Sequence, residues 1–320
     1  MKSLRAGIVV ALSTGLSLLA ADTPPPPGSL RITLLGTGNP RPTSTRSGPA
    51  TLVEAGTTRI LVDAGRGVAE RLWSVGGREA LSGIDLVVLT HLHSDHVVGL
   101  PDLWLTGWIF GRKAPLKLIG PAGTAAMASH LTQAFAFDIE TRRDLDEKLP
   151  AAGAAFETRD VSPEAEIRVG GVTVTPFEVD HGPVKPAYGY RVTYRGRCVV
   201  FSGDTRYSEN VVSHAKGCDV LVHEVLAPEV ERREAKVQDA AAVQRIIEHH
   251  ITPEEAGRVF AAAKPRLAVY SHIVPSPTTA MELEGPTRKT YSGPLLVGED
   301  LMTITVGETI DVEKRSATER

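Results

Sequence analysis

The stretch Leu86-Val87-Val88-Leu89-Thr90-His91-Leu92-His93-Ser94-Asp95-His96 decides how this chain folds and what chemistry it carries. Its first five residues are an apolar run that predicts a buried strand. The next six place three imidazoles and a carboxylate directly after that strand. Such a density of polar side chains is hard to explain without a metal, because histidine nitrogen and carboxylate oxygen are common zinc ligands. We therefore predict a metal site built around His91, His93, Asp95 and His96.

Short apolar runs on both sides of this stretch predict further strands, and amphipathic segments between them predict helices. The expected strands are 30–35, 51–54, 59–63, 86–90, 116–119, 172–179, 188–194, 198–202, 220–224 and 267–271, and the expected helices are 67–75, 123–137 and 253–263. Strands in both halves with helices between them predict an α/β fold, in which two mixed sheets pack face to face and helices cover the outside. This arrangement is a four-layer αββα sandwich.

The N-terminal residues have the composition of an export signal. Lys2 and Arg5 precede an apolar run from Ala6 to Leu19, which is shorter than the roughly 20 residues of a membrane span. We expect a periplasmic or secreted mature protein without a membrane span, and an uncleaved anchor is the alternative. The expected organisation is a signal peptide at 1–21 with an undetermined cleavage point, a proline-rich spacer at 22–29, one large domain at 30–310 and a charged tail at 311–320.

The charge balance of the chain bears on whether it binds nucleic acid. The chain has 35 basic and 38 acidic residues and is 42% hydrophobic, which is typical of a soluble globular protein without a global basic field for nucleic acid.

Cys198 and Cys218 each stand near the start of a predicted strand. An oxidising compartment would permit them to pair. We expect two buried free thiols, with a disulfide as the alternative, and neither cysteine has metal-ligand spacing.

The motif His-x-His-x-Asp-His after a strand resembles the signature of the metallo-β-lactamase superfamily. Further segments resemble that family in order, and they offer His181, Asp204 and His272 as the remaining ligands. The resemblance implies one metal held by His91, His93, His181 and Asp204, and a second held by Asp95, His96, His272 and Asp204. The segment Ile60–Gly65 also matches the family, which implies that Asp63 orients the ligand loop.

Two divalent ions that share a carboxylate can deprotonate a bridging water and stabilise charge on the substrate. The resemblance implies that the resulting hydroxide attacks the substrate and that Asp95 orients it. We expect zinc, and manganese or iron remain alternatives because histidine and aspartate suit each of them.

Several segments resemble the ribonuclease Z and arylsulfatase-like branch of the superfamily, including Thr33–Gly38, Gly99–Pro101 and His250–Ala256. In that branch a glutamate and a histidine pair, and the histidine protonates the leaving oxygen. The resemblance therefore implies these roles for Glu224 and His250. The chain departs from the branch at Ile251, at Val225-Leu226, and in an inserted Gly182–Pro186 beside His181.

The sequence also bears on the class of substrate. We find no glycine- and basic-rich arm of the kind that grips transfer RNA, and with an export signal as well we do not expect a nucleic acid partner. A small anionic or aromatic ester is expected instead, with Trp104, Trp108 and Lys185 as substrate residues. The alternative is that the tryptophans belong to the core and the lysine to the solvated surface.

The function expected from the sequence is therefore an exported two-metal hydrolase that cleaves a phosphodiester or an arylsulfate ester. One alternative is the same site acting on a carboxylic ester, lactone, β-lactam or aryl halide, because such a centre admits many electrophiles. Others are a ribonuclease Z-type RNA endonuclease and a non-catalytic metal-binding module. The family resemblance also makes a homodimer possible.

Overall fold

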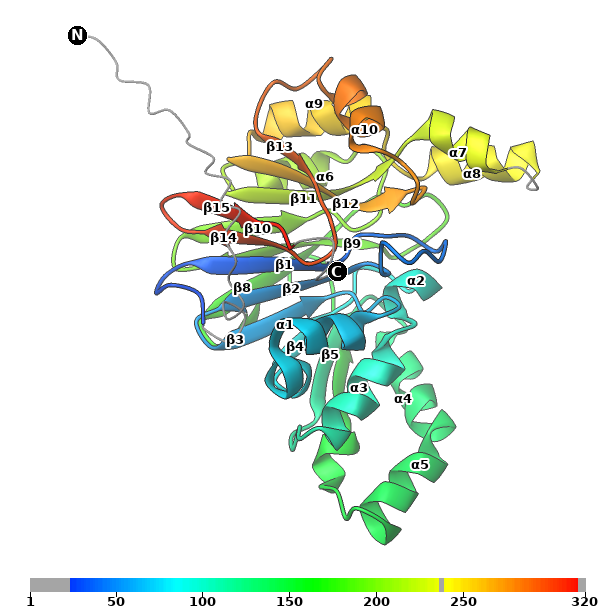
Figure 1. Ribbon diagram of the computed structural model, residues 1–320, viewed down its shortest axis with the longest axis vertical. Coiled ribbons are helices and arrows are strands. Elements are labelled where there is room, and N and C mark those ends of the chain that lie inside the picture. The colour runs from blue at the N-terminus through cyan, green and yellow to red at the C-terminus, as the bar shows by residue number, and fades with distance from the viewer. Residues whose placement is uncertain (1–23, 236–238, 316–320) are drawn as a thin grey trace.

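The computed structural model describes residues 24–235 and 239–315, so the expected signal peptide at 1–21 lies outside the described residues. The described chain forms two β-sheets that lie face to face, with helices on the outer side of each sheet (Figure 1). This confirms the predicted α/β architecture of two mixed sheets between outer helices. Within the described ranges, no helix combines the length and apolar character needed to cross a membrane.

The first sheet contains eight strands in the order β15-β14-β1-β2-β3-β4-β5-β6. Their bounds are β1 (Leu30–Gly36), β2 (Ala50–Ala55), β3 (Thr58–Val62), β4 (Leu86–Val88), β5 (Leu116–Gly120), β6 (Phe156–Asp160), β14 (Met302–Val306) and β15 (Ile310–Glu313). Strands β3 to β6 are parallel, and the remaining pairs are antiparallel. Strand β15 includes the first residues of the expected charged tail, because Val312 is buried there while its neighbours Asp311 and Glu313 stay exposed.

The second sheet contains seven strands in the order β13-β12-β11-β10-β9-β8-β7. Their bounds are β7 (Ile167–Val169), β8 (Val172–Glu178), β9 (Tyr188–Tyr194), β10 (Arg197–Phe201), β11 (Val220–Leu226), β12 (Leu267–Val274) and β13 (Leu295–Val297). Strands β10 to β13 are parallel and β7 to β10 are antiparallel. The parallel strands β11 and β12 are buried along their whole length, as expected for strands covered on both faces.

The three expected helices are present as α1, α4 with α5, and α9, and the other helices were not expected. Those in the first half are α1 (Val68–Ser82), α2 (Ser94–Val97), α3 (Leu100–Ile109), α4 (Thr124–Ala134), α5 (Ala136–Glu140), the π-helix η1 (Thr141–Leu145) and the 3₁₀-helix η2 (Ala151–Ala154). Those in the second half are α6 (Glu209–Ala215), α7 (Pro228–Glu234), α8 (Ala240–Glu248), α9 (Pro253–Ala263) and α10 (Ala280–Thr287). Helix α1 continues past the expected end with a kink at Gly76 and Gly77, the expected helix 123–137 breaks at Phe135, and α3 was not expected.

Cys198 and Cys218 form a disulfide, which corrects the expectation of two free thiols. Cys198 lies at the start of β10, and Cys218 lies just before β11, its parallel neighbour. The next residue, Asp219, donates its backbone N–H to the carbonyl of Cys198 at 3.0 Å. This pairing leaves the two Cα atoms 4.9 Å apart, within the range that a disulfide spans.

Candidate metal centre

The polar residues of the decisive motif lie just beyond the carboxyl end of β4. The strand ends at Val88, and the chain then runs through His91 and His93 into the short helix α2, which carries Asp95 and His96. Parallel strands in both sheets end at this side of the molecule, so the turns after them can bring distant residues together. The other predicted ligands follow β8, β10 or form part of β12, and they meet the motif there.

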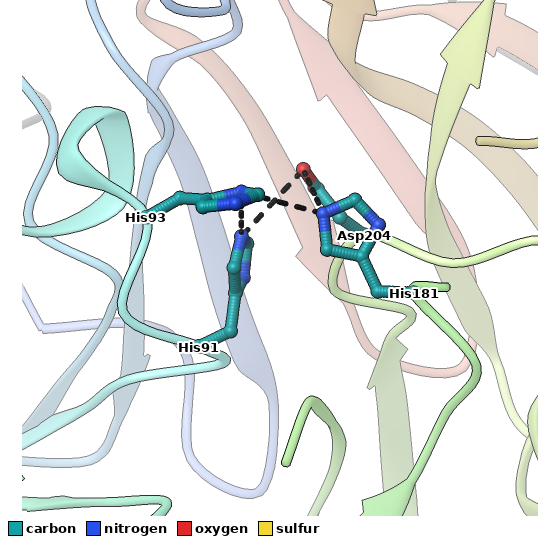
Figure 2. A group of neighbouring side chains, drawn as sticks. All are labelled: His91, His93, His181 and Asp204. Atoms are coloured by element: carbon teal, nitrogen blue, oxygen red, sulfur yellow. Dashed lines mark hydrogen bonds and ion pairs between the residues drawn. The ribbon is translucent and has the colours of Figure 1, made fainter. Parts of the chain in front are cut away.

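The first group of candidate ligands contains His91, His93, His181 and Asp204, and their side chains point toward one another (Figure 2). Nδ1 of His93 lies 3.0 Å from Nε2 of His91 and 3.3 Å from Nε2 of His181. Oδ2 of Asp204 lies 3.8 Å from the first of these Nε2 atoms and 3.9 Å from the second. The four ligand atoms lie within 4.8 Å of one another, close enough to converge on a single ion.

The second group contains Asp95, His96 and His272, whose ligand atoms also lie within 4.8 Å of one another. Nε2 of His272 lies 3.2 Å from Oδ2 of Asp95, and Nε2 of His96 lies 3.7 Å from the same oxygen. Oδ2 of Asp204 is 3.4 Å from the Nε2 atoms of both histidines. Asp204 therefore lies between the two groups, where the sequence predicted a shared carboxylate.

Two buried atoms indicate that these residues fit divalent ions. Nε2 of His96 and Oδ1 of Asp204 have no hydrogen-bond partner among the residues that the structure describes. A buried polar atom without a partner costs about 1–3 kcal/mol, so native proteins rarely keep one without a function. Both belong to donor types that zinc takes, and both lie where the two groups meet.

The charge states of three candidate ligands in the metal-free protein also suit metal binding. Burial lowers the pKa of His181 to about 4, and burial with neighbouring imidazoles lowers that of His91 well below its usual value. Both rings are therefore neutral near pH 7, with a lone pair available for an ion. Burial would raise the pKa of Asp204, but the imidazoles of His272 and His96 outweigh it and hold the carboxyl ionised. For His96 and His272, burial would lower the pKa, but the carboxylate of Asp204 outweighs it, so an ion displaces a proton from these two rings.

Hydrogen bonds to the second ring nitrogens fix the orientation of several candidate ligands. Nδ1 of His96 lies 2.9 Å from Oδ2 of Asp63, and Nδ1 of His91 lies 3.0 Å from the hydroxyl of Thr90. The carboxylate of Asp63 also accepts the backbone N–H of Thr90 at 2.8 Å. Asp63 thus contacts both the strand end and a ligand histidine, which is the position expected for it.

Glu224 and His250 are also brought together. Nδ1 of His250 lies 3.0 Å from Oε1 of Glu224, which also accepts the backbone N–H groups of Thr205 and Ile251. A ring nitrogen of His250 lies within 4.8 Å of the ligand atoms of Asp204 and His272. The imidazole is therefore fixed on one side by a carboxylate and borders the candidate metal centre on the other.

The structure corrects the expectation that two tryptophans contact substrate. Trp104 and Trp108 are fully buried under the first sheet, where Trp104 stacks on Phe156 at 4.4 Å between ring centroids. The indole N–H of Trp108 donates to the carbonyl of Pro150 at 2.9 Å. Arg112 lies buried beside them and donates to the main-chain carbonyls of Trp104 and Gly153. Of the residues expected to contact substrate, only Lys185 is exposed beside the centre.

Two residues beside His181 were not predicted as part of the site. The carbonyl of His249 accepts from Nδ1 of His181 at 2.9 Å, and the two rings are 5.0 Å apart. Arg206 donates to the carboxylate of Asp180 at 3.1 Å, next to the same ligand. The sequence signal for His249 was its position beside His250, which could equally indicate an exposed helix end.

Comparison with known proteins gives a family match and close relatives. Residues 58–273 match the Beta-lactamase superfamily domain. A protein of Mycobacterium bovis (strain BCG / Pasteur 1173P2) named Ribonuclease Z is 36% identical over 294 residues, which cover 87% of this chain and 98% of the relative. Another of that name, from Mycobacterium avium (strain 104), is 34% identical over 282 residues, covering 87% and 98%.

Solved structures share the fold at lower identity. The metallo-beta-lactamase fold protein YhfI from Bacillus subtilis has a TM-score of 0.67 and 20% identity, and the similarity covers 87% of this chain and 100% of that one. The short form of human tRNase Z has a TM-score of 0.63 and 21% identity, covering 86% and 98%. At these identities the structural similarity concerns the fold.

Proposed function

We propose that this chain, which belongs to the metallo-β-lactamase superfamily, is an RNA endonuclease of the ribonuclease Z type. It is a metal-dependent hydrolase, and it matches relatives named ribonuclease Z over nearly their whole length. The observation that supports this most directly is the combination of both ligand groups with the Glu224–His250 pair. A centre that had lost catalysis would not need to retain all of these residues.

This proposal corrects two expectations from the sequence. A small phosphodiester or arylsulfate ester was expected as the substrate, and a nucleic acid partner was not expected. The curated relatives named ribonuclease Z, at 34% to 36% identity, overturn both. The sequence has no basic arm, but such an arm contributes to gripping RNA and does not decide which bond the centre cleaves.

The metal centre would be formed by His91, His93, His181 and Asp204 on one side and by Asp95, His96 and His272 on the other, with Asp204 shared. Two divalent ions held there would supply Lewis acid stabilisation of the phosphoryl oxygens and would lower the pKa of a water molecule. We propose zinc for both, since the first group offers three histidines and a carboxylate, the second offers two histidines and two carboxylates, and zinc takes both kinds of ligand.

The side chains of the protein then orient the attacking water and protonate the leaving oxygen. Asp95 is fixed by His272 at 3.2 Å, and its carboxylate is placed to orient the attacking water. Glu224 holds Nδ1 of His250, which leaves the opposite ring nitrogen directed at the centre to deliver a proton to the leaving ribose oxygen. A Glu–His pair suits this step because a carboxylate beside the ring favours the protonated imidazole that donates the proton.

The test is cleavage of a structured RNA, including a transfer RNA precursor, by purified zinc-loaded protein. The matched control is DNA of the same sequence, which lacks the 2′-hydroxyl that distinguishes RNA. We expect discrete RNA products that require metal and are lost in a variant with Asp204→Ala. Metal-loaded protein that cleaves neither the precursor nor any other RNA would contradict the proposal.

We also propose that the mature enzyme works in an oxidising compartment, as a periplasmic or secreted protein. The charged and apolar composition of residues 1–21 supports this, and so does the Cys198–Cys218 disulfide, since cytosolic proteins seldom keep one. Cell fractionation and N-terminal sequencing of the mature protein test it. A cytoplasmic protein with an intact N-terminus would contradict it.

A further inference from the structure

A surface pocket of about 390 Å³ lies beside the candidate metal centre, and neither the family resemblance nor the proposed mechanism uses it. Its volume is within the range of about 300–1,000 Å³ that is typical of small-ligand sites. The residues around it come from the end of β8 and the residues after it, from the turn after His181, and from the start of α6 with the two residues before it. They are Glu178, Val179, Asp180, Lys185, Tyr207, Ser208, Glu209 and Asn210.

The insertion noted in the sequence forms one side of this pocket. The segment Gly182–Pro186 begins with a tight turn, in which the backbone N–H of Val184 donates to the carbonyl of His181 at 3.1 Å. The turn presents Lys185 to the pocket and exposes it to solvent. A departure from the family pattern is therefore located between a candidate metal ligand and the pocket.

Residues around the pocket are close in sequence to candidate metal ligands. Asp180 precedes His181, and its carboxylate accepts from Arg206 at 3.1 Å. Tyr207 follows Arg206 and lies three residues after Asp204, the carboxylate shared by both ligand groups. A ligand in the pocket would thus lie next to a group held at the metal centre.

The character of the walls indicates which part of a nucleotide fits. Tyr207 is 37% exposed, and its hydroxyl donates to Glu209 at 3.0 Å, which fixes the ring. The carboxylate of Glu178 has no hydrogen bond or ion pair with any residue in 24–235 or 239–315. An aromatic face suits the stacking of a base, and a free carboxylate accepts from an exocyclic amino group. Three carboxylates disfavour a phosphate in the same space.

We propose that this pocket binds the base of a nucleotide that flanks the scissile phosphate, and that Tyr207 stacks on it while Glu178 reads an exocyclic amino group. The inference rests on the proposed RNA substrate and adds a specificity site to it. Adenine, cytosine and guanine carry such an amino group and uracil does not, so the pocket discriminates against uridine at one position of the substrate.

The experiment measures RNA binding and cleavage by Tyr207→Ala, Tyr207→Phe and Glu178→Gln variants of the full chain. Binding of a short single-stranded RNA is measured by fluorescence anisotropy in metal-free protein, where no cleavage occurs. Cleavage of bis(p-nitrophenyl) phosphate, which has no base, serves as the check that the centre is intact. Glu157→Gln is the matched control, because Glu157 is an exposed strand carboxylate on β6 of the other sheet.

We expect Tyr207→Ala to weaken RNA binding by about 5- to 150-fold, which is the range reported for loss of one base stack. Tyr207→Phe should retain most of the affinity, and Glu178→Gln should reduce the preference against uridine. All three should hydrolyse the small phosphodiester at the wild-type rate. Equal RNA affinity in Tyr207→Ala and wild type would overturn the inference while wild-type RNA cleavage still stood. Absence of RNA cleavage by the wild type would instead overturn the proposed function.

Discussion

Oδ2 of Asp63 lies 2.9 Å from Nδ1 of His96, although the two residues are 33 positions apart in the sequence. The carboxylate comes from the end of β3 and the imidazole from α2, so this contact joins a strand of the first sheet to the helix that carries two candidate ligands. It fixes which nitrogen of His96 faces the metal centre. A group that touches no ion can therefore determine how well an ion is held.

Replacing Asp63 by Asn should weaken metal binding at the group of Asp95, His96 and His272. We expect a loss of about 10- to 100-fold in affinity, measured by calorimetric titration of the metal-free protein. Asp85→Asn is the control, because that carboxylate accepts the backbone N–H of Arg59 at the opposite end of the same strand. Unchanged affinity in the Asp63 variant would refute its orienting role.

Replacing His250 by Ala should slow cleavage of RNA by about 100- to 10,000-fold, the usual contribution of a general acid. The loss should be much smaller for a phosphodiester with a nitrophenolate leaving group, because that group departs without a proton. Steady-state kcat on both substrates checks this, with the exposed His130→Ala as control. Equal losses on the two substrates would rule out proton donation by His250.

Removal of metal should abolish hydrolysis and lower the melting temperature. The ligand groups bind ions only in the folded state, so each ion at 100 times its Kd adds about 2.7 kcal/mol of stability. Chelation followed by calorimetry and elemental analysis measures both effects, and stoichiometric zinc should restore them. Full activity with less than one ion per chain would be incompatible with a two-metal centre.

Replacing Cys198 and Cys218 together by Ser should destabilise the fold. The two residues are 20 positions apart, and closing a loop of this size stabilises a protein by about 3 kcal/mol in the chain-entropy description. The melting temperature of the double variant should fall, and reductant should lower that of the wild type to a similar value. A reductant-insensitive wild type would show that the bond is not formed.

Replacing Trp104 by Ala should reduce stability by about 3–5 kcal/mol, because it empties a fully buried position. The KM for RNA should not change, since the side chain contacts the core and not the pocket. Denaturant unfolding measures the first effect and steady-state kinetics the second. The matched variant is Trp73→Ala, which removes a side chain that is 47% exposed. A raised KM with unchanged stability would indicate that Trp104 contacts the substrate.

The candidate ligands could be predicted because each is tied to a strand end with a recognisable local pattern. Strand β4 and the histidines after it follow one another directly in the sequence, so no tertiary information was needed to place them together. His181, Asp204 and His272 were located through resemblance to a family, and the spatial grouping agrees with that assignment.

Other features depend on tertiary packing that local patterns do not encode. Trp104 and Trp108 follow the metal motif closely in sequence, but α3 turns them into the core under the first sheet. Strand β14 was missed although Met302, Ile304 and Val306 alternate with threonines, because its pairing with β1 joins opposite ends of the chain. The disulfide likewise depends on the neighbour relation of β10 and β11.

The spread of the ligand residues along the chain has a consequence for when this protein can act. His272 and Asp95 touch across 177 positions of sequence, and the shared carboxylate of Asp204 comes from the turn after β10, which lies between them in the sequence. A nascent chain still being translated, or one held unfolded, lacks part of the donor set. Metal-dependent hydrolysis is thus withheld until synthesis and folding are nearly complete.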